Sequence, residues 1–291
     1  MRIGGRGRVA GRVLLGVGLA LAAGGAAFGA GVDFRFGGAL TRGDFGGDST
    51  IELIEAPLEL VMQRPAARFT ISVPWVRIDR TGLVVPTPDG PAVLGIDAGG
   101  AGRPSFQTSP PGGRQSGLGD VTLREETYLL RAGGGLRPWL ALVLDLKLST
   151  ADESKGLGTG RRDWGAGLDY VQPLGKTWQI LAGGGKRFMG DPKGLDFNDR
   201  RHLRAGFAIV TSRVAVRAQA ETVTPLLDEV PAYNAAGVPI GLRKVDDRRT
   251  ATVDVTFRSP LGGTTRVGVV KGLTNASEDF GVMVTFSTGS Q

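Results

Sequence analysis

The residues best able to do chemistry in this 291-residue sequence are charged side chains that alternate with apolar ones. In residues 140–149, for example, Asp145 and Lys147 stand between leucines. Cysteine is absent and His202 is the only histidine, which excludes thiolate and histidine-cluster metal sites. We therefore expect no catalytic, metal-binding or cofactor-binding residue, and we expect that the charged side chains serve transport or structure.

His202 also limits nucleophilic catalysis. A Ser–His hydrolase acting on lipid would depend on this residue alone, and no serine motif accompanies it. The sequence GLGTG at residues 156–160 resembles a phosphate-binding loop, but a strand pattern follows where such a loop needs a helix. We interpret His202 as a structural residue and GLGTG as a turn, and we assign no function to the RGD sequence at residues 42–44.

The alternation itself indicates strands. In residues 140–149 leucine occupies every second position, so a helix would scatter these leucines around its circumference, whereas a strand places all of them on one face. The other face, with Asp145 and Lys147, tolerates water. One such strand does not show whether the apolar face meets a protein core or a lipid bilayer.

Twelve segments of this kind recur along the chain. They span residues 32–40, 50–63, 68–75, 119–132, 140–149, 163–171, 177–188, 202–210, 214–222, 251–257, 264–272 and 280–286. Short turns alternate strictly with long connections, which fall near 41–49, 80–118, 149–162, 189–200, 226–248 and 273–279. This pattern predicts an all-β fold, a single transmembrane up-and-down antiparallel β-barrel of the outer-membrane type.

Strand length supports the barrel, because a tilted membrane strand needs about 9–11 residues and an open sheet edge cannot exist in lipid. A secreted β-sandwich would show the same alternation. It has no reason, however, to sort its loops into two alternating length classes. One feature departs from the barrel pattern: Phe286 is followed by STGSQ, whereas barrel chains usually end on an aromatic residue that the assembly machinery reads.

The polar face of the predicted strands carries both charge signs, and we predict that it lines the lumen. The residues concerned are Arg35, Glu55, Glu59, Asp120, Arg124, Glu126, Asp145, Lys147, Asp163, Asp169, Arg204, Arg217, Glu221, Asp254 and Arg266. They could line a permeation path, or they could pair across strands and fill the barrel. A barrel of twelve strands is wider than barrels that side chains fill and narrower than barrels that leave an open channel, so both interpretations stand. Mixed signs argue against strong ion selectivity.

The first 30 residues have the pattern of a cleaved signal peptide: four arginines, an apolar run and a small-residue end. Without them the formal charge falls from +7 to about +3, and this charge is dispersed, so no nucleic-acid partner is expected. The domain organisation is then a signal peptide at 1–30 and a barrel at 31–291. The extracellular loop 80–118 contains apolar pieces at 82–85 and 92–96. We hypothesise that it caps or enters the barrel mouth, so that deleting 85–112 raises conductance.

Three stretches go beyond generic patterning: SGLGDVTLREETYLL from residue 116, LDLKLSTADESKGLGTGRRDWGAGLDYV from residue 144 and GGGKRFMGDPKG from residue 183. With Gly117–Asp120, Lys147–Thr150 and Leu157–Gly160 followed by Asp163, the chain resembles the meta-pathway of phenol degradation family of outer-membrane transporters. Ser149 departs from the proline usual there. The resemblance implies an outer-membrane barrel that passes small, often aromatic or apolar, molecules.

These observations predict a passive channel or transporter for small molecules, aromatic or hydrophobic ones among them, in the outer membrane of a Gram-negative-type envelope. Its expected partners are outer-membrane lipid, a small-molecule permeant and the barrel assembly machinery. Two alternatives from other classes stay open. One is a closed structural or adhesive barrel, and the less favoured one is a barrel lipid hydrolase that depends on His202.

Overall fold

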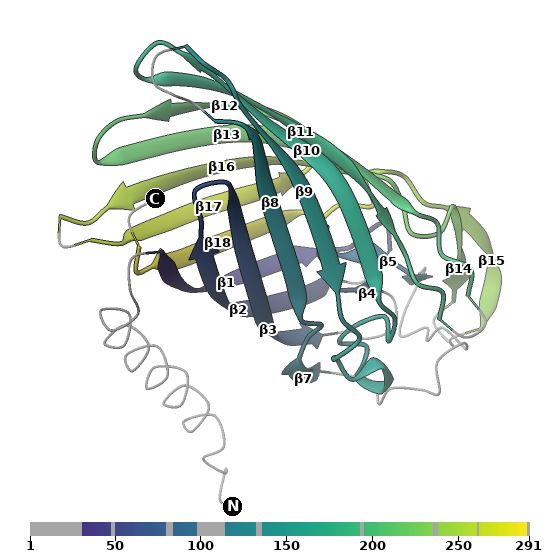
Figure 1. Cartoon of the computed structure of the whole chain (residues 1–291). Coiled ribbons are helices and arrows are strands. Elements are labelled where there is room, and N and C mark those ends of the chain that lie inside the picture. Colours follow the sequence, from purple (N-terminus) through teal and green to yellow (C-terminus); the bar gives the residue numbers. More distant parts are fainter. Residues whose placement is uncertain are drawn as a thin grey trace, which may run out of the picture.

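Twelve antiparallel strands form one closed barrel in the computed structural model (Figure 1). The structure describes residues 31–47, 50–79, 84–97, 114–131, 136–192, 195–234, 238–260 and 262–289. Neighbouring strands pair around the ring, and the pairing of β1 with β18 and of β2 with β3 completes the closure. The predicted up-and-down barrel of twelve strands is confirmed. The expected signal peptide, residues 1–30, lies outside the described residues.

Each of the twelve predicted segments corresponds to one barrel strand. The strands are β1 (Val32–Gly43), β2 (Ile51–Gln63), β3 (Ala67–Asp79), β8 (Thr122–Leu130), β9 (Trp139–Lys147), β10 (Asp163–Leu174), β11 (Trp178–Phe188), β12 (Arg200–Val210), β13 (Val214–Val223), β16 (Arg248–Arg258), β17 (Thr264–Gly272) and β18 (Phe280–Ser287). Short connections join them at one end of the barrel, the short-turn end, and longer ones at the other, the long-loop end.

Alternation gives the barrel an apolar exterior. Leu144 and Leu146 on β9 are 43% and 37% exposed, and Trp164 and Trp178 on the neighbouring strands also point outward. Asp145, between the two leucines, points inward with a side chain that is 14% exposed. An exterior of this kind suits hydrocarbon, and a closed ring leaves no unpaired edge within it. Among the described residues, no helix combines the length and the apolar character needed to cross a membrane.

The barrel wall changes course at the Gly117–Asp120 motif. The strand β7 (Arg114–Leu118) pairs with the part of β3 nearest the long-loop end, and β8 pairs with the rest of β3. Between β7 and β8, the Gly119 N–H donates to the Pro74 carbonyl oxygen at 2.8 Å. A Cβ atom on Gly119 would lie 2.8 Å from Val76. Only glycine therefore lets β3 approach this closely.

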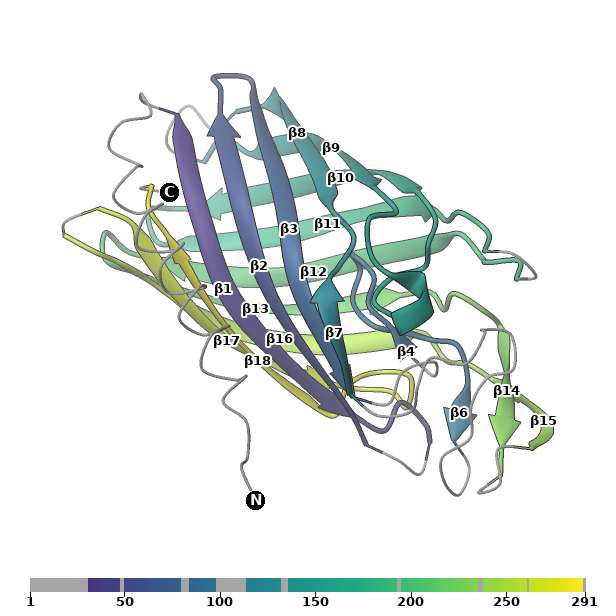
Figure 2. The ribbon, with the colours of Figure 1, turned by 90° about the horizontal axis from the view of Figure 1, so that it is seen from below.

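The predicted long loops contain secondary structure of their own, which the sequence patterns did not indicate. The short strands β4 (Val84–Val85) and β5 (Ala92–Val93) pair with each other, and a 3₁₀ turn, η1, spans Glu153–Lys155. In addition, β14 (Glu229–Tyr233) pairs with β15 (Pro239–Lys244) and, in parallel, with β6 (Ile96–Asp97). This three-stranded sheet lies beyond the barrel wall at the long-loop end (Figure 2).

Apolar packing holds loop segments against the inner wall of the barrel at the long-loop end. Val84 and Val93 pack in one buried cluster with inward-facing residues of β2 and β3, such as Leu53 and Ile78. Because loop segments cover the wall here, the inner faces of β2 and β3 are apolar at this level. Residues 84–97, which we call the mouth segment, therefore lie at the mouth of the barrel.

Candidate functional site: the charged lumen

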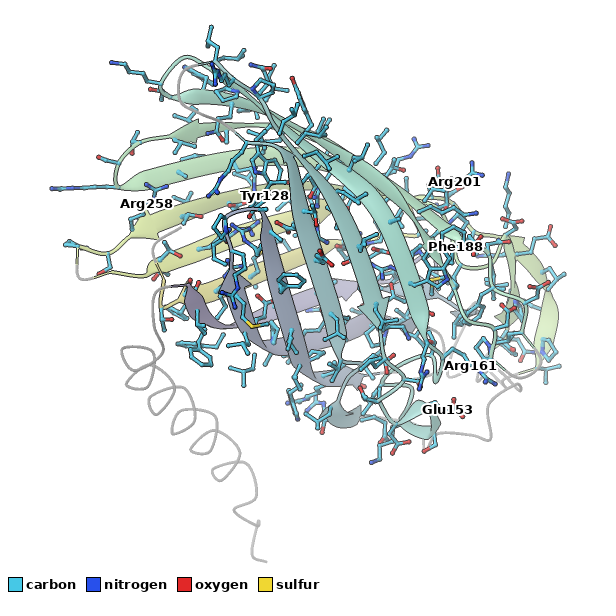
Figure 3. All side chains as sticks on the ribbon, viewed as in Figure 1. Tyr128, Glu153, Arg161, Phe188, Arg201 and Arg258 are labelled. Atoms are coloured by element: carbon cyan, nitrogen blue, oxygen red, sulfur yellow. The ribbon has the colours of Figure 1, made fainter. Side chains whose placement is uncertain are left out.

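Three adjoining cavities lie inside the barrel. The loop-side cavity, about 460 Å³, lies beneath residues 86–90 of the mouth segment. The turn-side cavity, about 420 Å³, extends toward the short-turn end and shares Glu59, Thr70, Arg124 and Arg204 with the first. A side pocket of about 260 Å³ adjoins the second cavity at Arg35, Glu59 and Arg266. Charged side chains extend over both ends of the barrel as well (Figure 3).

Most residues of the predicted lumen set border one of these cavities. The loop-side cavity is bordered by Glu55, Glu59, Asp120, Arg124, Asp145, Lys147, Arg204 and Glu221. The turn-side cavity adds Arg35, Glu126, Asp169, Arg217 and Arg266. The other two, Asp163 and Asp254, are buried in ion pairs within the wall, with side chains 0% and 3% exposed. That any of these residues lines a permeation path stays a prediction.

Lys147 is the centre of a buried cluster rather than a residue in contact with water. Its ammonium nitrogen lies 2.8 Å from Asp120 Oδ2 and 3.1 Å from Asp163 Oδ2, and its side chain is 1% exposed. It also donates to Thr159 Oγ1 at 2.8 Å and to the Arg161 carbonyl oxygen at 2.7 Å. A buried charge needs this degree of pairing. The cluster thereby fixes the loop that follows β9 to the wall.

The second oxygen of Asp120 extends that cluster. Asp120 Oδ1 accepts hydrogen bonds from the backbone N–H groups of Thr150 and Ala151 at 3.0 and 2.9 Å. A Cβ atom on Gly158 would lie 2.5 Å from Asp120 Oδ2. The Gly-Leu-Gly-Asp, Lys-Leu-Ser-Thr and Leu-Gly-Thr-Gly motifs therefore meet at one place. Their common role here is to hold a loop against the barrel wall.

A belt of ion pairs separates the two main cavities. Arg124 lies 3.1 Å from Glu126, 3.4 Å from Asp145 and 3.3 Å from Asp169. Asp169 also pairs with Arg204, although β11 separates their strands. This pair is possible because Gly183 stands in register between Asp169 and Arg204 and has no side chain.

The same arrangement recurs one strand earlier. Gly165 on β10 stands in register between Asp145 and Arg187, whose charged groups approach to 3.6 Å across it. Glycine at these inward positions thus lets side chains on alternate strands meet. The consequence is that charges form a connected network around the inner wall rather than isolated neighbouring pairs.

The mouth segment is attached to this network at Asp89. Its carboxylate accepts hydrogen bonds from Arg187 Nε at 2.7 Å and Arg187 Nη2 at 3.1 Å, a bidentate pair. Burial raises the pKa of Asp89, but the hydrogen bonds and charge of Arg187 outweigh burial and bring that pKa below its usual value. Arg200 Nη1 donates to Thr87 Oγ1 at 2.6 Å, and this bond holds Thr87 of the mouth segment to β12.

Arg248 supports the same segment from β16. It donates to both carboxylate oxygens of Glu278, at 2.9 and 2.5 Å, and its Nη1 lies 3.4 Å from the Asp89 carbonyl oxygen. Gly90 lies directly against the guanidinium, since a Cβ atom there would be 2.7 Å from Arg248 Cζ. Three strands therefore hold the turn of the mouth segment across the lumen.

Several of these contacts were missed by sequence reasoning. Arg187 falls on the inward register of the predicted segment 177–188 and could have been found from its alternation. Arg248 falls on the inward register of β16, which begins three residues before its predicted segment. Arg200 was placed in a loop because β12 begins two residues before the predicted segment. Asp89 had no signal, since its role depends on a loop that folds back into the barrel.

His202 borders the loop-side cavity. Its role as a structural histidine stays a prediction. Among the described residues, no group of three or more His, Cys, Asp or Glu side chains is placed to hold a metal ion. The GLGTG segment forms a turn with Gly160 at a positive φ of 68°. A strand, β10, follows it where a phosphate-binding loop needs a helix.

A closed barrel with an apolar exterior and a charged interior containing cavities defines the class of fold used by outer-membrane channels. A comparison with solved structures agrees with this class. An outer membrane channel from Pseudomonas putida F1 matches with a TM-score of 0.63 and 13% identity, over 90% of this chain and 96% of that one.

Two weaker likenesses have TM-scores of 0.48 and 0.44. They are the KdgM porin in complex with disordered oligogalacturonate, 6% identical over 89% of this chain and 99% of that one, and the Pseudomonas putida toluene transporter TodX, 11% identical over 90% of each chain. At these identities the likeness shows the fold alone. Comparisons with family models and with curated proteins give no match.

Proposed function

We propose that this protein is an outer-membrane channel through which small molecules pass passively. The observation that carries the proposal is a closed barrel with an apolar exterior and adjoining internal cavities bordered by charged side chains. The exterior suits a lipid bilayer, whereas charged groups inside the barrel require water or polar permeants around them. The fold of the Pseudomonas putida F1 channel supports the same proposal.

In this proposal the mouth segment restricts entry. It packs on the inner wall through Val84 and Val93 and is attached to the charged network through Asp89. A loop held by both apolar packing and an ion pair would narrow the mouth above the loop-side cavity. Permeants would enter past this segment and move toward the short-turn end.

The finer proposal concerns permeants and relatives. The resemblance to the meta-pathway of phenol degradation family supports small aromatic or hydrophobic permeants. The residues that carry the resemblance, such as Gly119, Asp120 and Lys147, fix a loop to the wall, so they support kinship of fold more than choice of ligand. Outer-membrane lipid around the apolar exterior and the barrel assembly machinery complete the proposed partners. No catalytic step is proposed.

The test is reconstitution of the chain without residues 1–30 in planar bilayers, with conductance recorded in the presence and absence of small aromatic solutes. Discrete conductance steps that such solutes block are expected. Uptake of the same solutes into liposomes covers uncharged permeants, which carry no current. A folded barrel that is silent in both assays would overturn the proposal and favour a closed structural or adhesive barrel.

The hydrolase alternative has its own measurement. Lipid hydrolysis by the wild-type barrel is compared with hydrolysis by the His202→Ala variant. We expect no hydrolysis from either protein. An activity that the wild type shows and the variant lacks would make the protein an enzyme and remove the channel as its main function.

A further inference from the structure

The side pocket lies against five consecutive strands, β2, β1, β18, β17 and β16, near the short-turn end. Arg35 on β1 and Arg266 on β17 both border it, on either side of β18. In register, Arg35 pairs with Ser287, and Arg266 pairs with Thr285, two residues away on the same strand. The two guanidinium groups therefore border one small volume from opposite sides.

Both arginines have donor capacity to spare. Among the described residues, the Nε atoms of Arg35 and Arg266 are inaccessible to water and have no hydrogen-bond partner. Arg35 lies near carboxylates only at distances too long for hydrogen bonds, 3.6 Å to Asp33 and 4.0 Å to Glu59. Buried N–H groups of charged side chains are rarely left unpaired. An acceptor that enters the pocket would pair with these two Nε groups once the arginine side chains turn toward it.

The nearby carboxylates are already engaged. Asp33 accepts hydrogen bonds from the hydroxyls of Ser287 and Thr288 at 2.6 and 2.8 Å. Asp254 Oδ2 is shared by two arginines, Arg217 Nε at 3.0 Å and Arg266 Nη2 at 2.9 Å. One carboxylate thus serves two guanidinium groups. Among the charged residues that border the pocket, two are arginines and one, Glu59, is a carboxylate.

Exposure reinforces this imbalance. In these ion pairs the arginine side chains Arg217 and Arg266 are 32% and 34% exposed, whereas that of their partner Asp254 is 3% exposed. The same holds at the belt, where Arg204 is 32% and Asp169 13% exposed. In these pairs the guanidinium groups are more exposed to the lumen than their carboxylate partners. At Arg35 the order is reversed, with 17% of its side chain exposed against 26% for Glu59.

We propose that Arg35 and Arg266 form a binding site for the carboxylate of a small organic anion on its way through the barrel. This proposal rests on the proposed channel function and narrows its permeants to anions. The hydroxyls of Thr256, Thr264 and Thr285 border the same pocket and supply further donors. Glu59 also borders it and opposes an anion, but it is one carboxylate against two guanidinium groups. An uncharged aromatic molecule has no negatively charged acceptor for these guanidinium groups.

The test is isothermal titration of the folded, detergent-solubilised barrel, without residues 1–30, in a low-chloride buffer. Benzoate is compared with benzyl alcohol, which keeps the ring and loses the charge. Benzoate is expected to bind with a defined stoichiometry and benzyl alcohol not to bind. Arg35→Gln and Arg266→Gln should each weaken benzoate binding at least about tenfold, the loss of one charge-assisted contact.

The matched control is Arg249→Gln, an arginine on the outer face of β16 whose side chain is 59% exposed. It should leave benzoate binding unchanged. Arg35→Lys and Arg266→Lys keep the charge and lose the planar fork, so they should bind with intermediate affinity and also serve if a glutamine variant fails to fold. Equal binding of benzoate and benzyl alcohol, no benzoate binding, or unchanged binding in every lumen variant would overturn the site.

Conductance in potassium chloride, measured on the same preparations, separates the two proposals. A conducting barrel that does not bind benzoate would remove the site and leave the channel function standing. A barrel that binds benzoate, but neither conducts nor takes up solutes into liposomes, would remove the channel function and leave the site.

Discussion

At the scale of single residues, the inner wall is governed by charges that have few ways to be satisfied. Lys147, whose side chain is 1% exposed, pairs with both Asp120 and Asp163 in the interior of the wall. A buried cluster of charges that is fully paired contributes little to the free energy of unfolding. Removing one of its members leaves the remaining charges buried without a partner. The residues with the largest expected effects are therefore those at the centre of a cluster.

Lys147→Met should destabilise the barrel by about 3–5 kcal/mol, because it leaves Asp120 and Asp163 without their shared ammonium group. Unfolding in urea, followed by the heat-dependent gel shift of folded barrels, measures the change. Lys155→Met is the matched control: Lys155 pairs with Asp152 in an exposed loop, and surface pairs of this kind contribute about 0–1 kcal/mol. Equal unfolding midpoints for the two variants would contradict the buried cluster.

The Gly183→Ala variant tests whether the ion pair between β10 and β12 needs glycine at the position between them. A Cβ atom here would overlap Asp169 Oδ1 and lie 2.8 Å from Arg204 Nε, so the Asp169–Arg204 pair must separate. Overpacking of this kind typically costs about 1–3 kcal/mol. Gly38→Ala is the matched control, since the nearest atom to its added Cβ is 3.9 Å away. Urea unfolding should separate the two variants, and a neutral Gly183→Ala would show that the belt tolerates a side chain at this position.

At the scale of elements, the mouth segment is attached to the barrel by side-chain contacts and not by pairing with a barrel strand. It is an insertion between β3 and β7, attached to the barrel by a small apolar cluster and by Asp89. The bidentate ion pair between Asp89 and Arg187 is the strongest polar contact of this segment, whereas the wall strands are held by continuous backbone ladders. The balance between open and closed mouth should therefore respond to Asp89 before the barrel itself is affected.

Asp89→Asn removes the charge-assisted bond to Arg187, which is worth about 1.5–3 kcal/mol, or roughly tenfold or more in the opening equilibrium. We expect longer open times or larger conductance in planar bilayers. Asp152→Asn, in an exposed loop, is the control and should behave as the wild type. Identical recordings from Asp89→Asn and the wild type would mean that this ion pair does not hold the mouth.

The same residue sets the pH dependence. Because the pKa of Asp89 in the folded protein lies below its ordinary value, its attachment to Arg187 is complete above that ordinary value. The attachment is lost only as pH falls through the lowered pKa. Conductance of the wild type should thus be unchanged between pH 7 and about 5, and Asp89→Asn should be open across that range. An opening step of the wild type near pH 6 would assign the gate to another group.

Elements also show what the sequence can and cannot predict. All twelve barrel strands follow from alternation, because a strand with lipid on one side and water on the other must repeat every second residue. The hairpin β14–β15 and the mouth segment carry no such constraint, so their structure is not apparent from the pattern.

For the candidate site, alternation predicts which way a residue points but not how exposed it is. Asp163 and Asp254 were predicted for the lumen set, yet partner side chains bury both of them in the wall. Ion pairs across an intervening strand, such as Asp169 with Arg204, depend on the register between neighbouring strands. The sequence of one strand alone does not determine this register.

At the scale of the whole molecule, closure depends on the seam between the first and last strands. β1 pairs with β18 from Arg35↔Ser287 to Arg42↔Phe280. Ser287 and Thr288, which follow Phe286, add to this seam. Thr288 accepts a hydrogen bond from the Phe34 N–H through its Oγ1 at 3.0 Å, and it donates to Asp33. The extended end therefore ties the last strand to the first.

Asp33→Ala tests that role. Asp33 holds the end of β18 to β1, because the hydroxyls of Ser287 and Thr288 donate to its carboxylate. Each hydrogen bond to a charged group contributes about 1.5–3 kcal/mol. Since these bonds share one acceptor and are not additive, we expect a loss of at least about 2 kcal/mol in urea unfolding, together with slower refolding into lipid vesicles. Thr288→Val removes one donor and should show a smaller loss in the same direction. Asp44→Ala, in an exposed loop, is the control. If Asp33→Ala unfolds and refolds like Asp44→Ala, strand pairing alone closes the barrel and the added C-terminal residues have no part in it.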